Sequence, residues 1–162
     1  MYPEDVRKMD LKSTLQVFQE ADVPAGPGVT SGHTVKPLVG SPDHPSERLT
    51  IRLASFEPGT HERLHWHMIE AFYYVLSGRA VLEDIEGKTY DIGPGSVIYA
   101  PPGIAGSHEW RVQETLQLIF IRATTQLERI IPFRVDKKTK ESSIEADNLI
   151  KWAGARFKKS FY

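Results

Sequence analysis

The chain has 162 residues, of which 40% are hydrophobic and 25% are charged, and its formal net charge is −1. This length suits one domain, the composition is that of a globular protein rather than a disordered one, and the balanced charge argues against a general nucleic-acid binder. There is no run of 18 apolar residues, no visible secretory signal and no cysteine, so we expect a cytoplasmic protein without a membrane span, a disulfide or a thiolate metal site.

The charge is unevenly distributed along the chain. Residues 1–122 carry 11 basic and 16 acidic side chains, a net charge of −5, whereas residues 123–162 carry 9 basic and 5 acidic side chains, a net charge of +4. A basic tail can bind nucleic acid or a membrane, and it can also form a solvated helix face or a contact between subunits. We predict a homodimer in which the tail packs on protein, with no nucleic-acid or membrane partner.

Residues 1–32 are predicted to form an N-terminal arm. Leu11, Leu15 and Phe18 fit one face of a short helix, although Leu15 and Val17 also fit the alternation of a strand. Proline and glycine then interrupt regular structure at positions 24, 26, 27 and 28.

The segment 33–125 is predicted to consist of short strands. In 48–56, Leu49, Ile51 and Leu53 alternate with polar residues, which is typical of a half-buried strand with these three on its buried face. A hairpin that turns at Glu86–Gly87 is expected within 79–92, and further strands are expected at 71–78, 96–100 and 115–123. Short strands with turn signals every 8–12 residues predict a sandwich or a small barrel.

Residues 126–162 are predicted to be a C-terminal extension of the same domain. Ser142 precedes Glu145 by three residues, the spacing of a capping box, and apolar residues follow at spacings of four: Leu149, Ala153 and Phe157. We therefore expect a helix over residues 144–158.

Three of the six histidines, His61, His65 and His67, lie within seven residues. Residues two apart on a strand point to the same face, so His65 and His67 would project together, with Arg63 beside them. Two adjacent imidazoles can supply half of the coordination shell of zinc, iron, nickel, copper or manganese, and they can also be polar residues of a solvated strand face.

Two motifs around these histidines resemble those of the cupin superfamily. Four residues match the first motif and three match the second: Gly59, His65, His67 and Gly78, then Gly95, Pro101 and Gly103. The resemblance covers residues 48–122. It implies an all-β fold, an antiparallel double-stranded β-helix or jelly-roll barrel, in which inward side chains converge on a metal and a small ligand.

The cupin metal usually lies between two histidines and a glutamate of the first motif and a histidine of the second. His65 and His67 match the two histidines, but Ala71 stands where the glutamate is expected. Glu70 precedes it by one residue, so alternation turns Glu70 to the other face unless a bulge brings it back. Without a bulge, Glu70 is an acidic residue of the rim.

The second motif departs from the pattern as well, because Gly106 stands where its histidine is expected. His108 follows two residues later. An insertion of two residues after Gly103 would restore His108 as a ligand; without an insertion, that ligand is lost. We predict a metal site of His65, His67 and His108, with Glu70 as the uncertain fourth ligand.

The resemblance further implies a metal-dependent enzyme acting on a small polar or aromatic molecule, dioxygenase-like or isomerase-like, with Fe, Ni, Mn, Zn or Cu as its cofactor. Two residues are candidates for catalysis. Arg63 would face a substrate carboxylate or phosphate, or else mark the strand entrance, and Tyr73 would line the pocket or fill the core. Ala71 favours the alternative of a non-catalytic cupin that binds or senses a small ligand.

Overall fold

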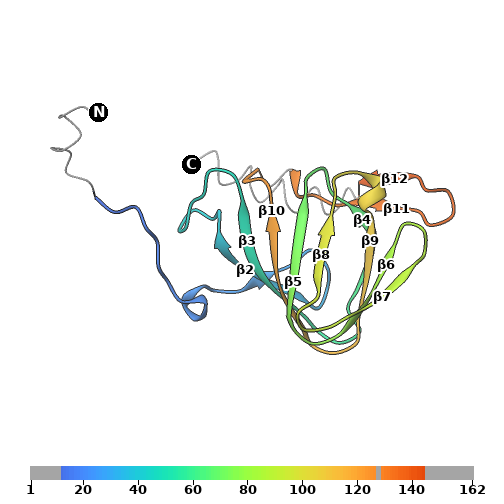
Figure 1. Cartoon of the computed structure of the whole chain (residues 1–162), viewed down its shortest axis with the longest axis horizontal. Coiled ribbons are helices and arrows are strands. Elements are labelled where there is room, and N and C mark those ends of the chain that lie inside the picture. Colours follow the sequence, from blue (N-terminus) through green and yellow to red (C-terminus); the bar gives the residue numbers. More distant parts are fainter. Residues whose placement is uncertain (1–11, 127–128, 145–162) are drawn as a thin grey trace, which may run out of the picture.

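The computed structural model describes residues 12–126 and 129–144, and all structural statements below concern these residues. Two six-stranded antiparallel sheets pack face to face and form an all-β barrel (Figure 1). The strands are β1 (Gly26–Pro27), β2 (His33–Val39), β3 (Thr50–Phe56), β4 (His61–Trp66), β5 (Ala71–Ser77), β6 (Ala80–Asp84), β7 (Thr89–Ile92), β8 (Val97–Ala100), β9 (His108–Val112), β10 (Leu116–Arg122), β11 (Phe133–Val135) and β12 (Ser142–Ile144).

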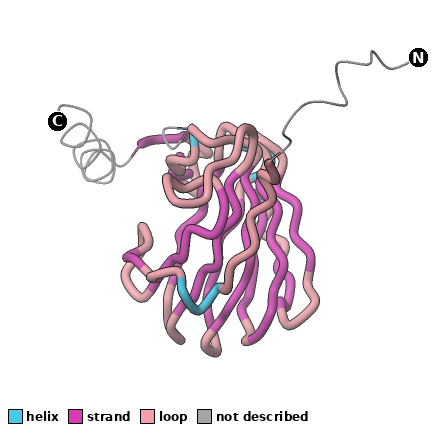
Figure 2. The backbone as a smooth tube through the Cα atoms, turned by 90° about the vertical axis from the view of Figure 1, so that its left-hand side faces the viewer, coloured by secondary structure: helices cyan, strands magenta, loops and turns pink. Residues whose placement is uncertain are grey.

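From β3 to β11 the chain crosses repeatedly between the two sheets, as in a jelly roll, with β6 and β7 as consecutive strands of one sheet. One sheet has the order β1-β2-β3-β10-β5-β8 and the other has the order β12-β11-β4-β9-β6-β7. Figure 2 shows the strands running side by side with loops at both ends of the barrel. The predicted hairpin at Glu86–Gly87 is confirmed, because β6 and β7 pair across it.

The core lies between the inner faces of the two sheets. On β10, Leu116, Leu118 and Phe120 are buried and Gln117 is exposed, so the predicted alternation is confirmed there. The same alternation makes Arg122 an inward-facing residue, and it is 5% exposed. Burial of the apolar side chains of both sheets stabilises the barrel through the hydrophobic effect.

The predicted buried face of β3 is wrong, although the strand itself is confirmed. Thr50 and Ala54 are fully buried and Arg52 shares their face, whereas Ile51 and Leu53 lie half-buried on the other face. Ile51 and Leu53 lie opposite isoleucines of β10, so both faces of this strand carry apolar side chains. In such a strand, the alternation of apolar and polar residues predicts where the strand lies, but it does not show which of the two faces is buried.

The predicted N-terminal helix is absent from its described part, because residues 12–19 have no regular secondary structure. A single 3-10 turn, η2 (Glu20–Asp22), follows instead. The segment contacts the loop between β2 and β3, where Phe18 stacks on His44 with ring centroids 3.6 Å apart. An isolated helix of this length is marginal in water. The described segment runs beside the barrel, outside its two sheets (Figure 1).

The C-terminal extension begins with a hairpin, β11–β12, that pairs with β4. Trp66 stacks on Phe133 with ring centroids 4.3 Å apart and donates a hydrogen bond from Nε1 to the hydroxyl of Ser142. Ser142–Ile144 is strand, and the rest of the expected helix at 144–158 lies outside the described residues. The described residues contain no helix that is long and apolar enough to cross a membrane.

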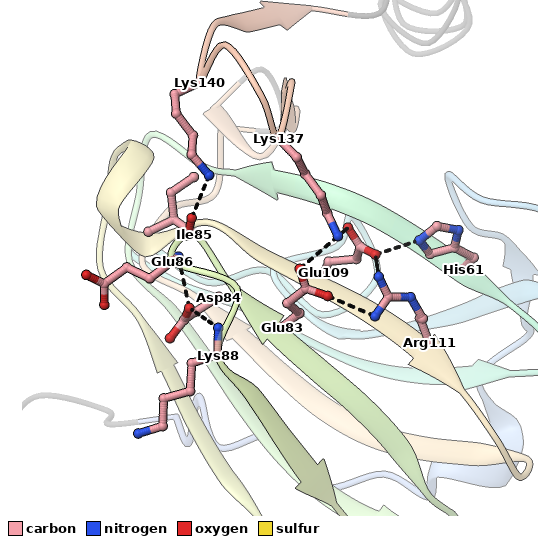
Figure 3. A network of polar contacts seen from close by, with 10 residues as sticks. All are labelled: His61, Glu83, Asp84, Ile85, Glu86, Lys88, Glu109, Arg111, Lys137 and Lys140. Atoms are coloured by element: carbon pink, nitrogen blue, oxygen red, sulfur yellow. Dashed lines mark hydrogen bonds and ion pairs between the residues drawn. The ribbon is translucent and has the colours of Figure 1, made fainter.

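An ion-pair network fastens the β11–β12 loop to the outer face of the second sheet (Figure 3). Lys137 contacts carboxylate oxygens of Glu83 at 2.8 Å and of Glu109 at 2.9 Å. Arg111 bonds to both glutamates, and His61 contacts Glu109 at 3.0 Å. These residues face away from the barrel interior, which separates them from the site described next.

Candidate metal centre

Three buried histidines meet inside the barrel. His65 of β4 lies opposite His108 of β9, and His67 follows directly after the end of β4. Each offers a nitrogen ligand, and these atoms all lie within 4.8 Å of one another. The structure therefore brings together the three histidines that the sequence singled out.

Backbone carbonyl groups orient the three imidazoles. The Nδ1 atoms of His65, His67 and His108 lie 2.7, 2.8 and 2.9 Å from the carbonyl oxygens of Arg63, Ile130 and Gly106. A carbonyl oxygen can only accept, so each Nδ1 carries the proton and each Nε2 keeps a lone pair. This tautomer is the one that metal-ligating histidines adopt when Nδ1 donates a hydrogen bond to a backbone carbonyl group.

The imidazoles are neutral at ordinary pH. Burial lowers the pKa of His108 to about 3, with a contribution from the charge of His65. Burial also lowers the pKa of His65, and together with Arg122 it lowers that of His67. Only a neutral imidazole can donate a lone pair to a metal, so the donor set fits a divalent transition metal.

Two further side chains touch the Nε2 atoms of this cluster. The hydroxyl of Tyr73 lies 3.0 Å from Nε2 of His108, and Nη2 of Arg122 lies 3.4 Å from Nε2 of His67. Because burial raises the pKa of Tyr73, its hydroxyl keeps its proton and can donate. Tyr73 thus packs in the core and also lines the cavity, and it contacts a candidate ligand directly.

Arg63 does not face the pocket, and that expectation is wrong. Three steps along β4, from Glu62 to His65, pair with two steps along β9, which is a β-bulge. The extra residue reverses the alternation, so Glu62 rather than Arg63 shares the side of His65. Arg63 is exposed, and its carbonyl oxygen is the part that contacts His65.

Glu62 is a carboxylate beside the histidines that the sequence did not reveal. Its Oε2 lies 3.9 Å from Nε2 of His65, and its Oε1 lies 3.4 Å from Nδ1 of His33. Burial alone would raise the pKa of Glu62, but the contacts with His33 and His65 outweigh it and lower the pKa to about 2. The carboxylate is therefore ionised throughout the neutral range.

Glu70 is not placed as a ligand. It is exposed, and its Oε1 accepts a hydrogen bond of 2.7 Å from the hydroxyl of Tyr99. The bulge lies earlier, within β4, and does not turn Glu70 inward. Ala71, where the resemblance leads one to expect glutamate, is inward and buried at 1% exposure.

The local fold around Gly106 explains the displaced histidine. Residues Ile104–Gly106 form a 3-10 turn, η3, directly before β9. A Cβ atom on Gly106 would lie 2.0 Å from the carbonyl oxygen of Pro101, so no side chain fits there. The turn delivers His108 to the position opposite His65, which agrees with the insertion that the sequence left open.

A cavity of about 90 Å³ is lined in part by His65 and His67 and has both charged and apolar walls. Its lining includes Tyr73, Glu62 and three arginines: Arg52, Arg122 and Arg134. The cavity also has an apolar wall, which includes Val35, Phe56, Trp110, Leu118 and Phe120.

Besides Glu62, other polar residues of the cavity were not anticipated, among them Arg122, Arg52 and His33. Arg122 could have been found, because the alternation of β10 turns it inward. Arg52 was missed because the opposite face of β3 was taken as buried. His33 comes from β2, outside both motifs, and nothing in the local pattern marks it.

Comparison with known proteins bears on this geometry. The family model of the cupin domain matches residues 52–122. The chain contains a cupin domain. No curated protein sequence matches the chain significantly.

Solved cupin-fold structures share the architecture at low sequence identity. A polyketide cyclase, RemF from Streptomyces resistomycificus, is 22% identical with a TM-score of 0.59 over 67% of this chain and 78% of that chain. A sugar phosphate isomerase from Silicibacter pomeroyi is 21% identical with a TM-score of 0.56 over 67% and 75% of the two chains.

A third structure contains Mn(II) centres. It is oxalate decarboxylase from Bacillus subtilis, 22% identical with a TM-score of 0.54 over 71% of this chain and 31% of that chain. At these sequence identities the similarity establishes a common fold. The cyclase, isomerase and decarboxylase activities are those of the three compared proteins and are not thereby assigned to this chain.

Proposed function

We propose that this cupin is a metal-dependent enzyme that acts on a small molecule, with His65, His67 and His108 as the metal ligands. One observation carries the proposal: three neutral, carbonyl-oriented imidazoles present their Nε2 atoms to one point beside a cavity. Three protein ligands leave coordination positions for a substrate, which is the arrangement of catalytic rather than structural sites.

The surrounding residues support a catalytic role. A bound divalent metal would supply a Lewis acid and open positions for substrate or dioxygen. Tyr73 would hold a proton beside His108, since its hydroxyl is neutral and buried. Glu62 would stay ionised, so it would accept hydrogen bonds or complete the ligand set. Its pKa is too low for it to be an efficient general base at neutral pH. Both the dioxygenase-like and the isomerase-like reaction fit these groups.

Metal analysis tests the proposal. Protein purified without chelator, or reconstituted with Fe, Ni, Mn, Zn or Cu, should bind one metal ion per chain. A protein that binds none of these metals stoichiometrically would contradict it. That result would favour the second candidate, a non-catalytic cupin that binds a small ligand in the same cavity, which the buried Ala71 still permits.

We further propose that the protein is a homodimer. Apolar side chains lie exposed on the outer face of β5 and β8: Tyr74 at 41%, Leu76 at 43%, Val97 at 60% and Tyr99 at 57%. Contiguous exposed apolar surface is typical of an interaction site. Light scattering of the full-length protein should give the mass of two chains. The same measurement on a chain that ends at residue 144 tests whether the C-terminal tail contributes to the dimer.

A further inference from the structure

The charges of the cavity do not balance. Three arginines line it, and among the described lining residues Glu62 is the one acidic side chain. That carboxylate already contacts His33 and His65. A divalent metal on the histidines would add two more positive charges. An anionic ligand would offset this excess.

Arg52 and Arg122 form a pair on the inner face of one sheet. Arg52 of β3 lies opposite Phe120 of β10, and Arg122 is two residues further along β10 on the same face. Diagonal neighbours of this kind lie about 7–8 Å apart, within reach of long side chains. Both guanidinium groups are positively charged, so they repel each other unless an anion offsets their charge.

Part of this pair has no protein partner. Nε of Arg52, and Nε and Nη1 of Arg122, are buried and have no hydrogen-bond acceptor among the described residues. Arg122 does contact Nε2 of His67 and lies over the rings of Tyr73 and Phe120, each 4.9 Å from its guanidinium carbon, but none of these groups is an anion. Buried cations without a counter-charge are costly, so their retention inside a cavity points to a ligand.

We propose that the substrate is a small organic carboxylate whose carboxylate group is bound by Arg52 and Arg122. The guanidinium fork matches the two oxygens of a carboxylate, and the apolar wall around Phe56 and Trp110 suits an organic body. The inference rests on the proposed function, because it takes the cavity beside the histidines as the reaction site. Arg122 touches His67, so a carboxylate held there lies next to the candidate metal ligands.

A substitution at Ala71 can place a carboxylate of the chain itself beside Arg122, where the substrate carboxylate is proposed to bind. It lies opposite Arg122 in the pairing of β5 with β10, and it is buried. Directly opposite side chains have Cβ atoms about 4.5–5.5 Å apart. The carboxylate of Ala71→Glu would therefore bind Arg122 and compete with the substrate.

Calorimetric titration tests the proposal with benzoate and pyruvate as carboxylates, benzamide as a neutral counterpart and inorganic phosphate as another anion. Each titration is done with chelator and again after metal loading. At least one carboxylate should bind, benzamide should not, and Arg52→Gln, Arg122→Gln and Ala71→Glu should each weaken binding about tenfold or more. Arg79→Gln, a change at an exposed arginine, should leave the affinity unchanged.

Several results would overturn the proposal: equal affinity for benzamide and benzoate, a preference for phosphate, no binding of either carboxylate, or unchanged affinity in both arginine variants. The comparison of benzoate with benzamide uses the native chain, so it stands even if a variant does not fold. A protein that takes up no metal but binds carboxylate through the arginines would contradict only the proposed function. Metal on the three histidines without carboxylate binding would contradict only this inference.

Discussion

Glu62 and His65 are three residues apart on β4, yet Oε2 of Glu62 lies 3.9 Å from Nε2 of His65. In a regular strand, residues three apart face opposite sides. The bulge between them places both side chains in the cavity. A carboxylate therefore accompanies the three histidines, although it comes from a different position than the glutamate expected after His67.

Glu62→Gln should weaken metal binding by about 10–100-fold, because it removes the negative charge beside His65 and leaves a similar shape. Glu70→Gln is the matched control, since Glu70 is exposed and contacts Tyr99. Competition with a chromogenic chelator measures both affinities. Equal losses in the two variants, or a loss only with Glu70→Gln, would contradict the placement of the two glutamates.

Tyr73→Phe should destabilise the chelator-treated protein by about 1–3 kcal/mol, because Nε2 of the buried His108 loses its donor. A metal would use the same lone pair, so the penalty should shrink after metal loading. Urea unfolding with and without metal measures the difference. Tyr90→Phe, which removes a hydrogen bond to Asp84 on the surface, is the control and should have a small effect in both states. A Tyr73→Phe penalty that is the same with and without metal would contradict the metal's use of His108.

The barrel strands and the histidine pair could be predicted from the sequence, because alternation and the spacing of His65 and His67 are local. Glu62 could not, since the bulge depends on how β4 pairs with β9. Nor could the unsatisfied nitrogen atoms of Arg122: its inward position follows from alternation on β10, but only the folded barrel shows that Nε and Nη1 have no hydrogen-bond acceptor among the described residues. His108 could be predicted in part. The sequence suggested it as a ligand if two residues were inserted after Gly103, and the turn at Gly106 is what supports this insertion.

The network around Lys137 predicts a pH dependence of stability. Hydrogen bonds from Lys137 and Arg111 lower the pKa of Glu83. Burial would raise the pKa of Glu109, but Lys137 and His61 outweigh it and lower that pKa too. Carboxylates with a folded pKa below the unfolded value stabilise the protein above the unfolded pKa of about 4.5, and this stabilisation is lost as the pH falls through the folded values.

Lys137→Gln should therefore lower the free energy of unfolding by about 1 kcal/mol at pH 7, a modest value because the lysine is partly exposed. The difference from the native protein should shrink as the pH falls below about 4.5 and vanish once the pH lies below the folded pKa values of Glu83 and Glu109. Denaturant unfolding between pH 7 and pH 3 measures it, with Lys138→Gln as the control from the same loop. A difference that grows toward acid pH would contradict the assigned ion pairs.

The coordination of a metal by three histidines is the central claim, and an anomalous difference map from a metal-loaded crystal tests it most directly. The account predicts one peak at about 2.0–2.2 Å from the Nε2 atoms of His65, His67 and His108, and its loss in His67→Ala. His44→Ala, which changes a histidine that stacks on Phe18 outside the barrel, should keep the peak. A bound metal that lies elsewhere in the chain, or that keeps its full occupancy at this position without His67, would contradict the account.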